Sequence, residues 1–418
     1  MMKTKKLLLT TISISSLLLL AACGNGSSSD TAEGKEDDGV TLELFSNKGE
    51  NIDTLESVIA KFEVENPGVN IELQSPPEAE TVLKTRLTKN DVPDIMAIGG
   101  NATFGELARA GVLVDISETN LLQKVQPAYL DMSKKLVGTE VEGNFGVPYA
   151  TNANGVLINQ DILDELGLGV PKTYAEFIAA LEIAKEQGEV PILFTLKDAW
   201  TAMPIWNGLG GNLAPENFAE LKTADDTSFV EGYDEVATKI AELVKYGEGD
   251  IFGLGYDDGN KQFANGEGLF YIQGNWAIPE ILKNNPDANI NFMALPSSDD
   301  QAENKLVSGI DVMLAISEQS EYKEEAKKFV EFMISEEISN QYIDEQKAFS
   351  AIQGVLQEDP TFANIKVFFE EGNIDSFPDH FYPAGMGAEN IVQGYLIDGD
   401  KDVFLKMMDS EWDKVVNR

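Results

Sequence analysis

The sequence has only one cysteine and one histidine among its 418 residues. A single cysteine cannot form an internal disulfide, and one cysteine with one histidine cannot build a Cys/His zinc site. His380 alone offers no supported general base, so a Ser-His-Asp triad is not expected. Basic residues are also scarce, since 31 Lys and Arg stand against 71 Asp and Glu, a formal net charge of −40. A field of this sign repels nucleic acid phosphates and anionic lipid, which excludes nucleic acid as an expected partner.

The residues that are present in quantity are typical of a globular protein. Hydrophobic residues make up 43% of the chain and aromatic residues 9%, which argues against disorder. The length suits about two or three domains, enough for a large buried core. Composition therefore indicates a soluble, acidic, globular protein.

The amino terminus has the pattern of a secretory signal over residues 1–22. Lys3, Lys5 and Lys6 precede an apolar stretch, Leu7 to Ala22. That stretch is interrupted by Ser and Thr and is short for a transmembrane helix, which needs about 20 apolar residues. The only cysteine, Cys23, follows in Leu-Ala-Ala-Cys-Gly, which resembles the bacterial lipobox, where the cysteine is acylated and becomes the first residue. An ordinary secretory signal is the alternative interpretation.

Residues 23–39 are rich in Gly, Ser and acidic residues and show no apolar periodicity. Such a segment cannot bury enough apolar surface to fold, so it is predicted to be a flexible tether. With acyl chains on Cys23, the tether would hold the folded part outside the cytoplasm on the cell membrane, as on a Gram-positive-type cell surface. Contact with the membrane is expected only through this lipid anchor.

The folded part begins with the pattern of an α/β protein. Apolar residues alternate from Val40 to Leu44, which predicts a strand, and they recur at helical spacing from Leu55 to Phe62. A second strand is predicted over residues 69–73, so the three segments form a βαβ unit with parallel strands. A further helix and strand are predicted over residues 78–89 and 94–98, and helices over 322–335 and 403–416. In the last helix, an apolar stripe indicates a packing face made of Phe404, Met407, Met408, Trp412 and Val415.

Several short motifs occur in one order along residues 40–335. They are Phe62-x-x-x-Asn66-Pro67-Gly68, Val92-Pro93-Asp94-Ile95, Gly111-x-Leu113-x-Asp115, Gly146-Val147-Pro148-Tyr149, Phe263-x-x-Gly266 and Gly274-Asn275-Trp276. Together they resemble the extracellular solute-binding proteins of bacterial carbohydrate ABC importers, the family of maltose-binding and multiple-sugar-binding proteins.

The resemblance implies a two-lobe, periplasmic-binding-protein-like α/β fold with a hinge and a ligand cleft between the lobes. Lobe 1 is expected over residues 40–148 and 306–349, and lobe 2 over residues 149–305 and 350–418. The implied function is a membrane-anchored receptor that binds a carbohydrate, expected to be an oligosaccharide, and delivers it to the transmembrane permease subunits of an ABC importer. A monomer is expected, with no enzymatic activity, no cofactor and no metal.

A sugar presents C–H faces that pack on aromatic rings and hydroxyls that need carboxylates or amides. The aromatic candidates, named from the resemblance, are Trp276, Trp200, Phe381 and Tyr382. The polar candidates follow predicted strands or lie near the crossings between lobes, and they are Asn47, Glu50, Asn101, Asp311, Asn275 and Tyr149. A core position for Trp276, a loop-anchoring role for Phe381 and Tyr382, and a hinge-lining role for Tyr149 remain open.

Other functions are compatible with parts of the sequence. A glycosidase needs only two suitably spaced carboxyls, which chance pairs among 71 acidic residues would supply. The same fold could bind a polyamine, which suits acidic residues and aromatic rings, or glycerol phosphate, which would call for Lys or Arg in the cleft. An adhesin or structural surface protein is a further class, although long internal repeats are lacking.

Overall fold

The computed structural model describes residues 39–77 and 79–417. The predicted signal peptide, the lipidation site Cys23 and all but the last residue of the predicted tether lie outside these residues. Residues 39–418 form one compact unit by their contacts. In the part of the chain that is described, no helix has the length and apolar character needed to cross a membrane.

The amino-terminal elements confirm the predicted βαβ unit. Strands β1 (Val40–Ser46) and β2 (Val69–Gln74) pair in parallel on either side of helix α1 (Ile52–Glu65), and the register aligns Val40 with Val69. The apolar face of α1 packs into the core through Leu55, Val58 and Phe62. Strand β3 (Ile95–Ile98) follows α2 (Ala79–Thr88) and also runs parallel to β1. The carboxyl ends of β1 and β3 therefore lie at the same edge of the sheet.

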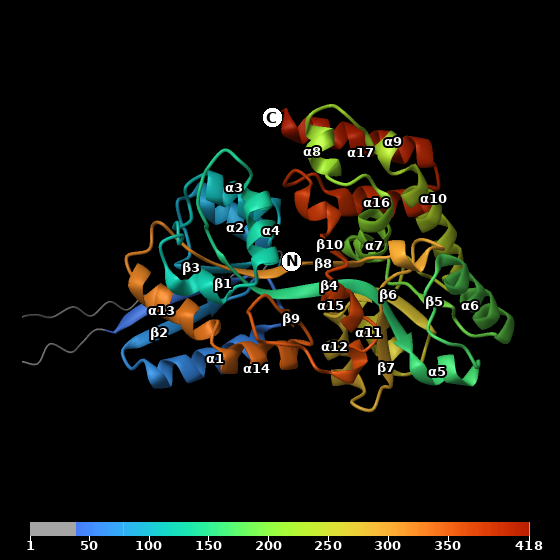
Figure 1. Cartoon of the computed structure of the whole chain (residues 1–418), viewed down its shortest axis with the longest axis horizontal. Coiled ribbons are helices and arrows are strands. Elements are labelled where there is room, and N and C mark those ends of the chain that lie inside the picture. The colour runs from blue at the N-terminus through green and yellow to red at the C-terminus, as the bar shows by residue number, and fades with distance from the viewer. Residues whose placement is uncertain (1–38, 78, 418) are drawn as a thin grey trace, which may run out of the picture. The chain divides into compact units, whose positions relative to one another are not determined.

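One mixed sheet runs through the whole unit in the order β2-β1-β3-β8-β4-β6-β5. Its two long central strands, β4 (Val147–Asn159) and β8 (Leu306–Ile316), pair antiparallel and pass from one group of helices to the other (Figure 1). The register of this pair shifts on either side of Ala150, which marks a β-bulge. The remaining strands are β5 (Ile192–Leu193), β6 (Phe270–Gly274), β7 (Ile290–Met293), β9 (Phe349–Ser350) and β10 (Ile374–Asp375).

Buried hydrophobic residues separate into clusters that define two lobes. Lobe 1 is built on β1 to β3 and on α1, α2, α3 (Ala102–Arg109), α4 (Pro127–Val137), α13 (Lys323–Met333) and α14 (Glu336–Gln346). Its cluster continues past Phe349 as far as Val355, a little beyond the predicted boundary. Strand β4 contributes Ala150 to this cluster and Val156 to that of the other lobe, so the strand itself crosses between them.

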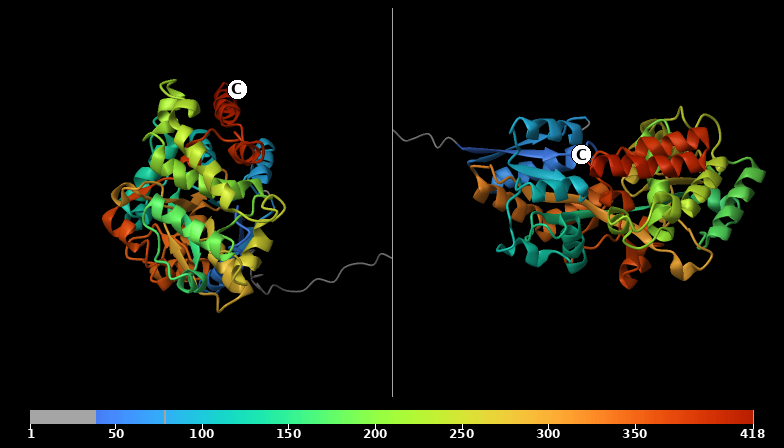
Figure 2. Two further views of the ribbon diagram at one scale, coloured as in Figure 1. Left: turned by 90° about the vertical axis from the view of Figure 1, so that its right-hand side faces the viewer. Right: turned by 90° about the horizontal axis from the view of Figure 1, so that it is seen from above.

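Lobe 2 holds the other two clusters, and Figure 2 shows both lobes from two further directions. Its helices are α5 (Gln160–Glu165), α6 (Tyr174–Gln187), α7 (Met203–Leu213), α8 (Phe218–Thr223), α9 (Phe229–Gly232), α10 (Asp234–Leu243), α11 (Tyr256–Ala264), α12 (Ala277–Asn284), α15 (Lys366–Glu371), α16 (Ala388–Asp398) and α17 (Lys401–Val416). Short 3-10 helices lie at η1 (Asn120–Lys124), η2 (Ala199–Ala202), η3 (Val244–Tyr246), η4 (Gln301–Glu303), η5 (Pro360–Phe362) and η6 (Pro378–Phe381).

In helix α17, the predicted apolar packing face includes one residue that the structure leaves exposed. Phe404, Met408 and Trp412 are buried and pack on the aromatic core of lobe 2, as expected. Met407 is 47% exposed, because it lies just outside the arc that the other three residues share.

Candidate functional site

The site begins at the edge of the sheet where β1 and β3 end. Asn47 follows β1, and its backbone N–H donates to the carbonyl of Ala97 in β3 (3.2 Å). Asn101 follows β3 and caps α3, because its Oδ1 accepts from the backbone N–H of Thr103 (3.0 Å). Its Nδ2 donates to Oε1 of Glu80 (3.2 Å). The two loops thus place amide and carboxylate groups together, as the parallel strands require.

A charged cluster joins the first of these loops to the crossing strands. The ammonium of Lys48 lies 2.6 Å from Oδ1 of Asp311 on β8 and 3.4 Å from Oε1 of Glu50. Asn152 on β4 donates to the same Asp311 oxygen (2.7 Å). Burial opposes the charge on Lys48, but the two carboxylates outweigh it, so the pKa of Lys48 is raised above its ordinary value. The ammonium is therefore a fixed positive charge beside the crossing strands.

Lobe 2 contributes the turn η6. The rings of Phe377 and His380 are stacked, with centroids 4.8 Å apart, and both lie over Gly309 of β8. A Cβ atom at position 309 would come within 2.8 Å of the Phe377 ring, so this close approach requires glycine. Burial lowers the pKa of His380 despite the neighbouring carboxylates of Asp379 and Asp311. The imidazole is thus held neutral, with one nitrogen able to accept and one able to donate.

Several buried side-chain atoms at this place have no hydrogen-bond partner among the described residues. They are Oδ1 of Asn47, Oδ1 of Asn152, Oδ1 of Asn154, Oδ1 of Asp379 and Nδ1 of His380. A buried polar atom without a partner costs about 1–3 kcal/mol, so such atoms are rare unless a ligand or water bonds to them. Another residue of this kind is Asn260 on α11, away from these loops in sequence.

A cavity of about 270 Å³, partly open to solvent, lies between the two lobes beside Asp379 and His380. Lobe 1 lines it with Glu80, Asn101 and Thr103, and lobe 2 lines it with Asp379, His380 and the segment that leads into α16. Asp379 and His380 were missed by sequence reasoning, which considered His380 only as a catalytic base. Lys48 was not among the predicted contacts either.

Two predicted tryptophans lie on the lobe 2 side. Trp276 is half-buried, its Nε1 donates to Oε1 of Gln273 (3.3 Å), and its ring centroid is 6.5 Å from that of Phe377. Trp200 is 41% exposed and makes an edge contact with Tyr256 at 4.8 Å between centroids. Trp276 therefore lies next to the stacked rings of η6, and Trp200 offers an open face.

The structure places four predicted contacts in other roles. Tyr149 is 1% exposed in the lobe 1 core, where it packs edge-on against Tyr342, so it has no surface to offer a ligand. Asn275 is also buried and both ends of its amide are occupied, because Oδ1 accepts from Ala153 N–H (2.6 Å) and Nδ2 donates to Lys347 O (2.8 Å).

The other two are neighbours at the end of η6. Tyr382, directly after η6, is 4% exposed, and its hydroxyl bonds to Nε1 of Trp206 and to the hydroxyl of Tyr233, both at 3.1 Å, so its ring packs in the lobe 2 core while the residue also lines the polar cavity. Phe381 packs instead against the hydrophobic cluster of lobe 1 and lines a second, larger cavity. The predicted residues that the structure does bring to the site are Asn47, Glu50, Asn101, Asp311 and Trp276.

In the described part of the chain, no three His, Cys, Asp or Glu side chains gather into a group that could hold a metal ion. The groups at the site are amides, carboxylates, one ammonium, one neutral imidazole and aromatic rings. This set suits an uncharged ligand rich in hydroxyl groups better than a reaction centre.

Two α/β lobes that share their crossing strands and enclose a polar, aromatic-lined site define a two-lobed solute-binding protein. The chain belongs to the bacterial extracellular solute-binding protein family, whose profile matches residues 48–339. This is a family of binding proteins, so the comparison gives no support to the glycosidase alternative.

Individual relatives cover most of the chain. A multiple sugar-binding protein of Streptococcus mutans is 30% identical over 359 residues, which span 82% of this chain and 81% of that protein. The melibiose/raffinose/stachyose-binding protein MelE of Bacillus subtilis is 22% identical over 407 residues, 88% of this chain and 87% of that protein. Among solved structures, SBP RafE in complex with raffinose has a TM-score of 0.76 and 27% identity, over 90% of this chain and 99% of that chain.

Proposed function

We propose that this protein is an extracytoplasmic receptor that binds a short oligosaccharide between its two lobes and delivers it to an ABC importer. The observation that carries the proposal is the group of unpartnered buried polar atoms beside the Phe377–His380 stack and Trp276. Sugars need aromatic rings for their C–H faces and polar partners for their hydroxyls, and both chemistries meet at this place.

The polar atoms also match the way a hydroxyl bonds. Each hydroxyl donates one hydrogen bond and accepts others. The carbonyl oxygens of Asn47 and Asn152 and the carboxylate of Asp379 accept, whereas the ammonium of Lys48 donates. A polyol can therefore bond to both kinds of group at once, without adding charge to the cavity.

The competing ligands differ in how well they suit this cavity. Its carboxylates would attract a polyamine, so spermidine is the competing ligand that the test must separate from a sugar. A phosphate would meet the carboxylates of Glu80 and Asp379, and the described residues that line the cavity include no Lys or Arg to pair with it. Relatives named for raffinose, stachyose and melibiose make these three sugars the first ligands to test.

The test is calorimetric titration of the chain without its first 23 residues, which retains every residue of the compact unit. Raffinose, stachyose, melibiose, maltose, spermidine and glycerol 3-phosphate would be titrated in parallel. The expected result is saturable binding of one of the sugars, and that sugar is recovered chemically unchanged after the titration. Binding of spermidine alone, or of no sugar, would refute the proposal.

A matched pair of variants then places the site. Asn47→Ala removes a buried, unpartnered amide oxygen at the edge of the sheet beside Asn101 and should weaken sugar binding about tenfold. Asn340→Ala is the control, because among the described residues the Asn340 amide bonds only to the Glu336 carbonyl of its own helix α14. If the two variants bind the sugar with equal affinity, the site does not include Asn47 and lies elsewhere.

The remaining parts of the proposal concern the cell. The receptor is a monomer, held at the membrane surface by acyl chains on Cys23, and its lobes dock on the transmembrane subunits of the permease. Growth of the producing cells with a labelled fatty acid should label the full chain and not Cys23→Ala. Release of both forms into the medium to the same extent would contradict the anchor.

A further inference from the structure

The segment Ile374–Tyr382 belongs to lobe 2 but lies against both lobes. It is tied to the crossing strands at its start, because β10 pairs in parallel with β8 and Asp375 contacts Lys305 (3.1 Å). It is tied to the lobe 2 core at its end, through the hydrogen bonds of Tyr382 to Trp206 and Tyr233. Between these two anchors, its side chains face in different directions.

Three consecutive residues of this segment face three different parts of the molecule. His380 stacks on Phe377 and lines the polar cavity between the lobes. Phe381, the next residue, packs against the hydrophobic cluster of lobe 1. Tyr382, one residue further, is buried in lobe 2. A movement of this turn therefore changes the sugar site and the contact with lobe 1 together.

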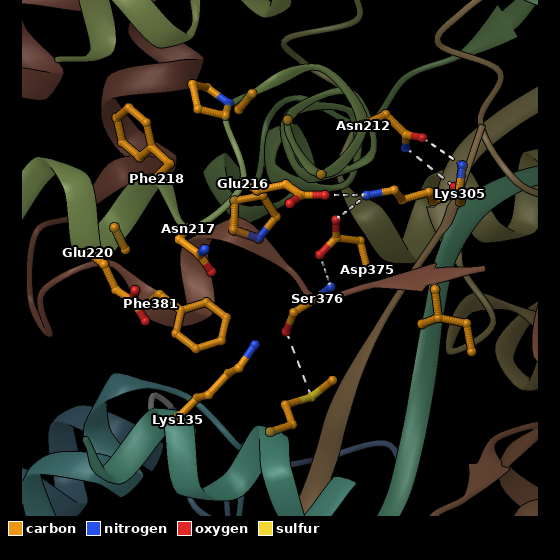
Figure 3. Close-up of a pocket in the computed structure, with 18 of the residues that line it drawn as sticks. Lys135, Asn212, Glu216, Asn217, Phe218, Glu220, Lys305, Asp375, Ser376 and Phe381 are labelled. Atoms are coloured by element: carbon orange, nitrogen blue, oxygen red, sulfur yellow. Dashed lines mark hydrogen bonds and ion pairs between the residues drawn. The ribbon is translucent and has the colours of Figure 1, made fainter. Parts of the chain in front are cut away.

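The surroundings of Phe381 show that its contact bridges an open space. A cavity of about 400 Å³ separates α4 of lobe 1 from residues 210–220 of lobe 2, and Phe381 lies in it. Figure 3 shows the ring between Lys135 on α4 and the side chains of Asn217 and Glu220. Near the ring, Ser376 Oγ lies 3.7 Å from Sδ of Met132 on α4, a second contact of this segment with lobe 1. The apolar contact between the lobes at this place therefore depends largely on the ring of Phe381, which a single substitution can remove.

We infer that Phe381 is an interlobe latch, which stabilises the arrangement of the lobes seen in this structure and couples it to occupation of the neighbouring site at Asp379 and His380. The inference rests on the proposed function for its ligand. A receptor whose competent form is less populated binds more weakly in proportion, even when every ligand contact is intact. Phe381 is accordingly a positioning residue and makes no contact with the sugar.

The experiment measures closure and affinity separately. The only cysteine, Cys23, is absent from the chain without its first 23 residues, so two introduced cysteines can be labelled uniquely. Val64→Cys on α1 and Val403→Cys on α17 are suitable, since these side chains are 83% and 55% exposed and belong to different lobes. The distance distribution between spin labels is recorded with and without raffinose, and raffinose binding is titrated by calorimetry.

Phe381→Ala, Phe381→Leu and Phe368→Ala are compared in this background. Phe368 is a half-buried phenylalanine of α15 that packs only within lobe 2, so it controls for loss of a ring. Phe381→Ala is expected to broaden the distances toward longer values and to raise the raffinose Kd about tenfold. Phe381→Leu keeps an apolar contact and should restore most of both values.

Two results would overturn the latch. One is a Phe381→Ala chain whose distances and affinity match those of Phe368→Ala. The other is weaker raffinose binding by Phe381→Ala while its distance distributions, with saturating raffinose and without it, match those of the parent chain. Phe381 would then be a direct ligand contact. If the parent chain binds no sugar at all, the proposed function fails, and the ligand-free distances of Phe381→Ala and Phe368→Ala alone decide on the latch.

Discussion

Replacing Asp311 by Asn tests whether the charged cluster beside the crossing strands is held together as a unit. Asp311 accepts from the ammonium of Lys48 (2.6 Å) and from the amide of Asn152 (2.7 Å). Asp311→Asn keeps the size of the side chain and removes its charge. The ammonium is then left with Glu50 at 3.4 Å as its only carboxylate partner within 4 Å among the described residues.

The expected cost follows from the burial of the pair. Removing one partner of a fully buried ion pair costs about 3–5 kcal/mol, because the remaining charge is left uncompensated. Here the side chains of Lys48 and Asp311 retain 18% and 13% exposure, and Glu50 stays nearby. We therefore expect the free energy of unfolding to fall by about 2 kcal/mol, and sugar affinity to fall with it.

The assay is urea unfolding of four chains that form a double-mutant cycle. Lys48→Met keeps the aliphatic stem without the charge, and the double variant Lys48→Met/Asp311→Asn removes both charges at once. The double variant should be more stable than the sum of the single losses predicts, by about 1 kcal/mol or more. Additivity within about 0.5 kcal/mol would refute the reasoning, because it would mean that the two groups do not interact.

Three other substitutions distinguish residues that contact the sugar from residues that hold the site in place. Burial lowers the pKa of His380 below its ordinary value of 6.5, so the imidazole takes up a proton at higher pH in the unfolded chain than in the folded chain. The free energy of unfolding therefore falls as the pH drops below about 6.5. His380→Gln should flatten this dependence in urea titrations between about pH 5 and about pH 7, and an unchanged slope would contradict it. Tyr382→Phe removes the hydroxyl that bonds Trp206 and Tyr233 and anchors the turn that carries His380, so it should lower stability by about 1–2 kcal/mol and also weaken sugar binding, as unfolding and calorimetry together would show. Trp276→Ala should weaken sugar binding about tenfold or more at little cost in stability, and a large loss of stability with normal binding would make Trp276 a core residue.

The beginning of the fold could be predicted because its signals are local. Alternating residues from Val40 and helical spacing from Leu55 to Phe62 specify the βαβ unit without any distant contact. The continuous sheet could not be deduced in this way, since the pairing of β4 with β8 joins segments far apart in the sequence. Its strands are buried on both faces and carry no period that tells one partner from another.

The site was predictable only where a side chain follows a strand end. Asn47 and Asn101 have that signal, because loops at the carboxyl ends of parallel strands meet at one edge. His380 has no such signal, since its place depends on the turn η6 resting over Gly309. Tyr149 and Asn275 had suitable chemistry for a sugar, but packing and backbone hydrogen bonds already use those side chains.

The bulge beside Ala150 has a mechanical consequence for how this receptor would open. A register shift interrupts the ladder between β4 and β8 and increases their twist locally, so bending strain concentrates there rather than along the whole strand. Groups near this pivot, such as Asn152, sweep through short arcs when the lobes rotate, whereas groups farther along either lobe sweep through longer ones. The groups next to the bulge therefore keep their relative positions when the sugar leaves. A new sugar is bound by movement of the parts of the site that lie farther from the bulge.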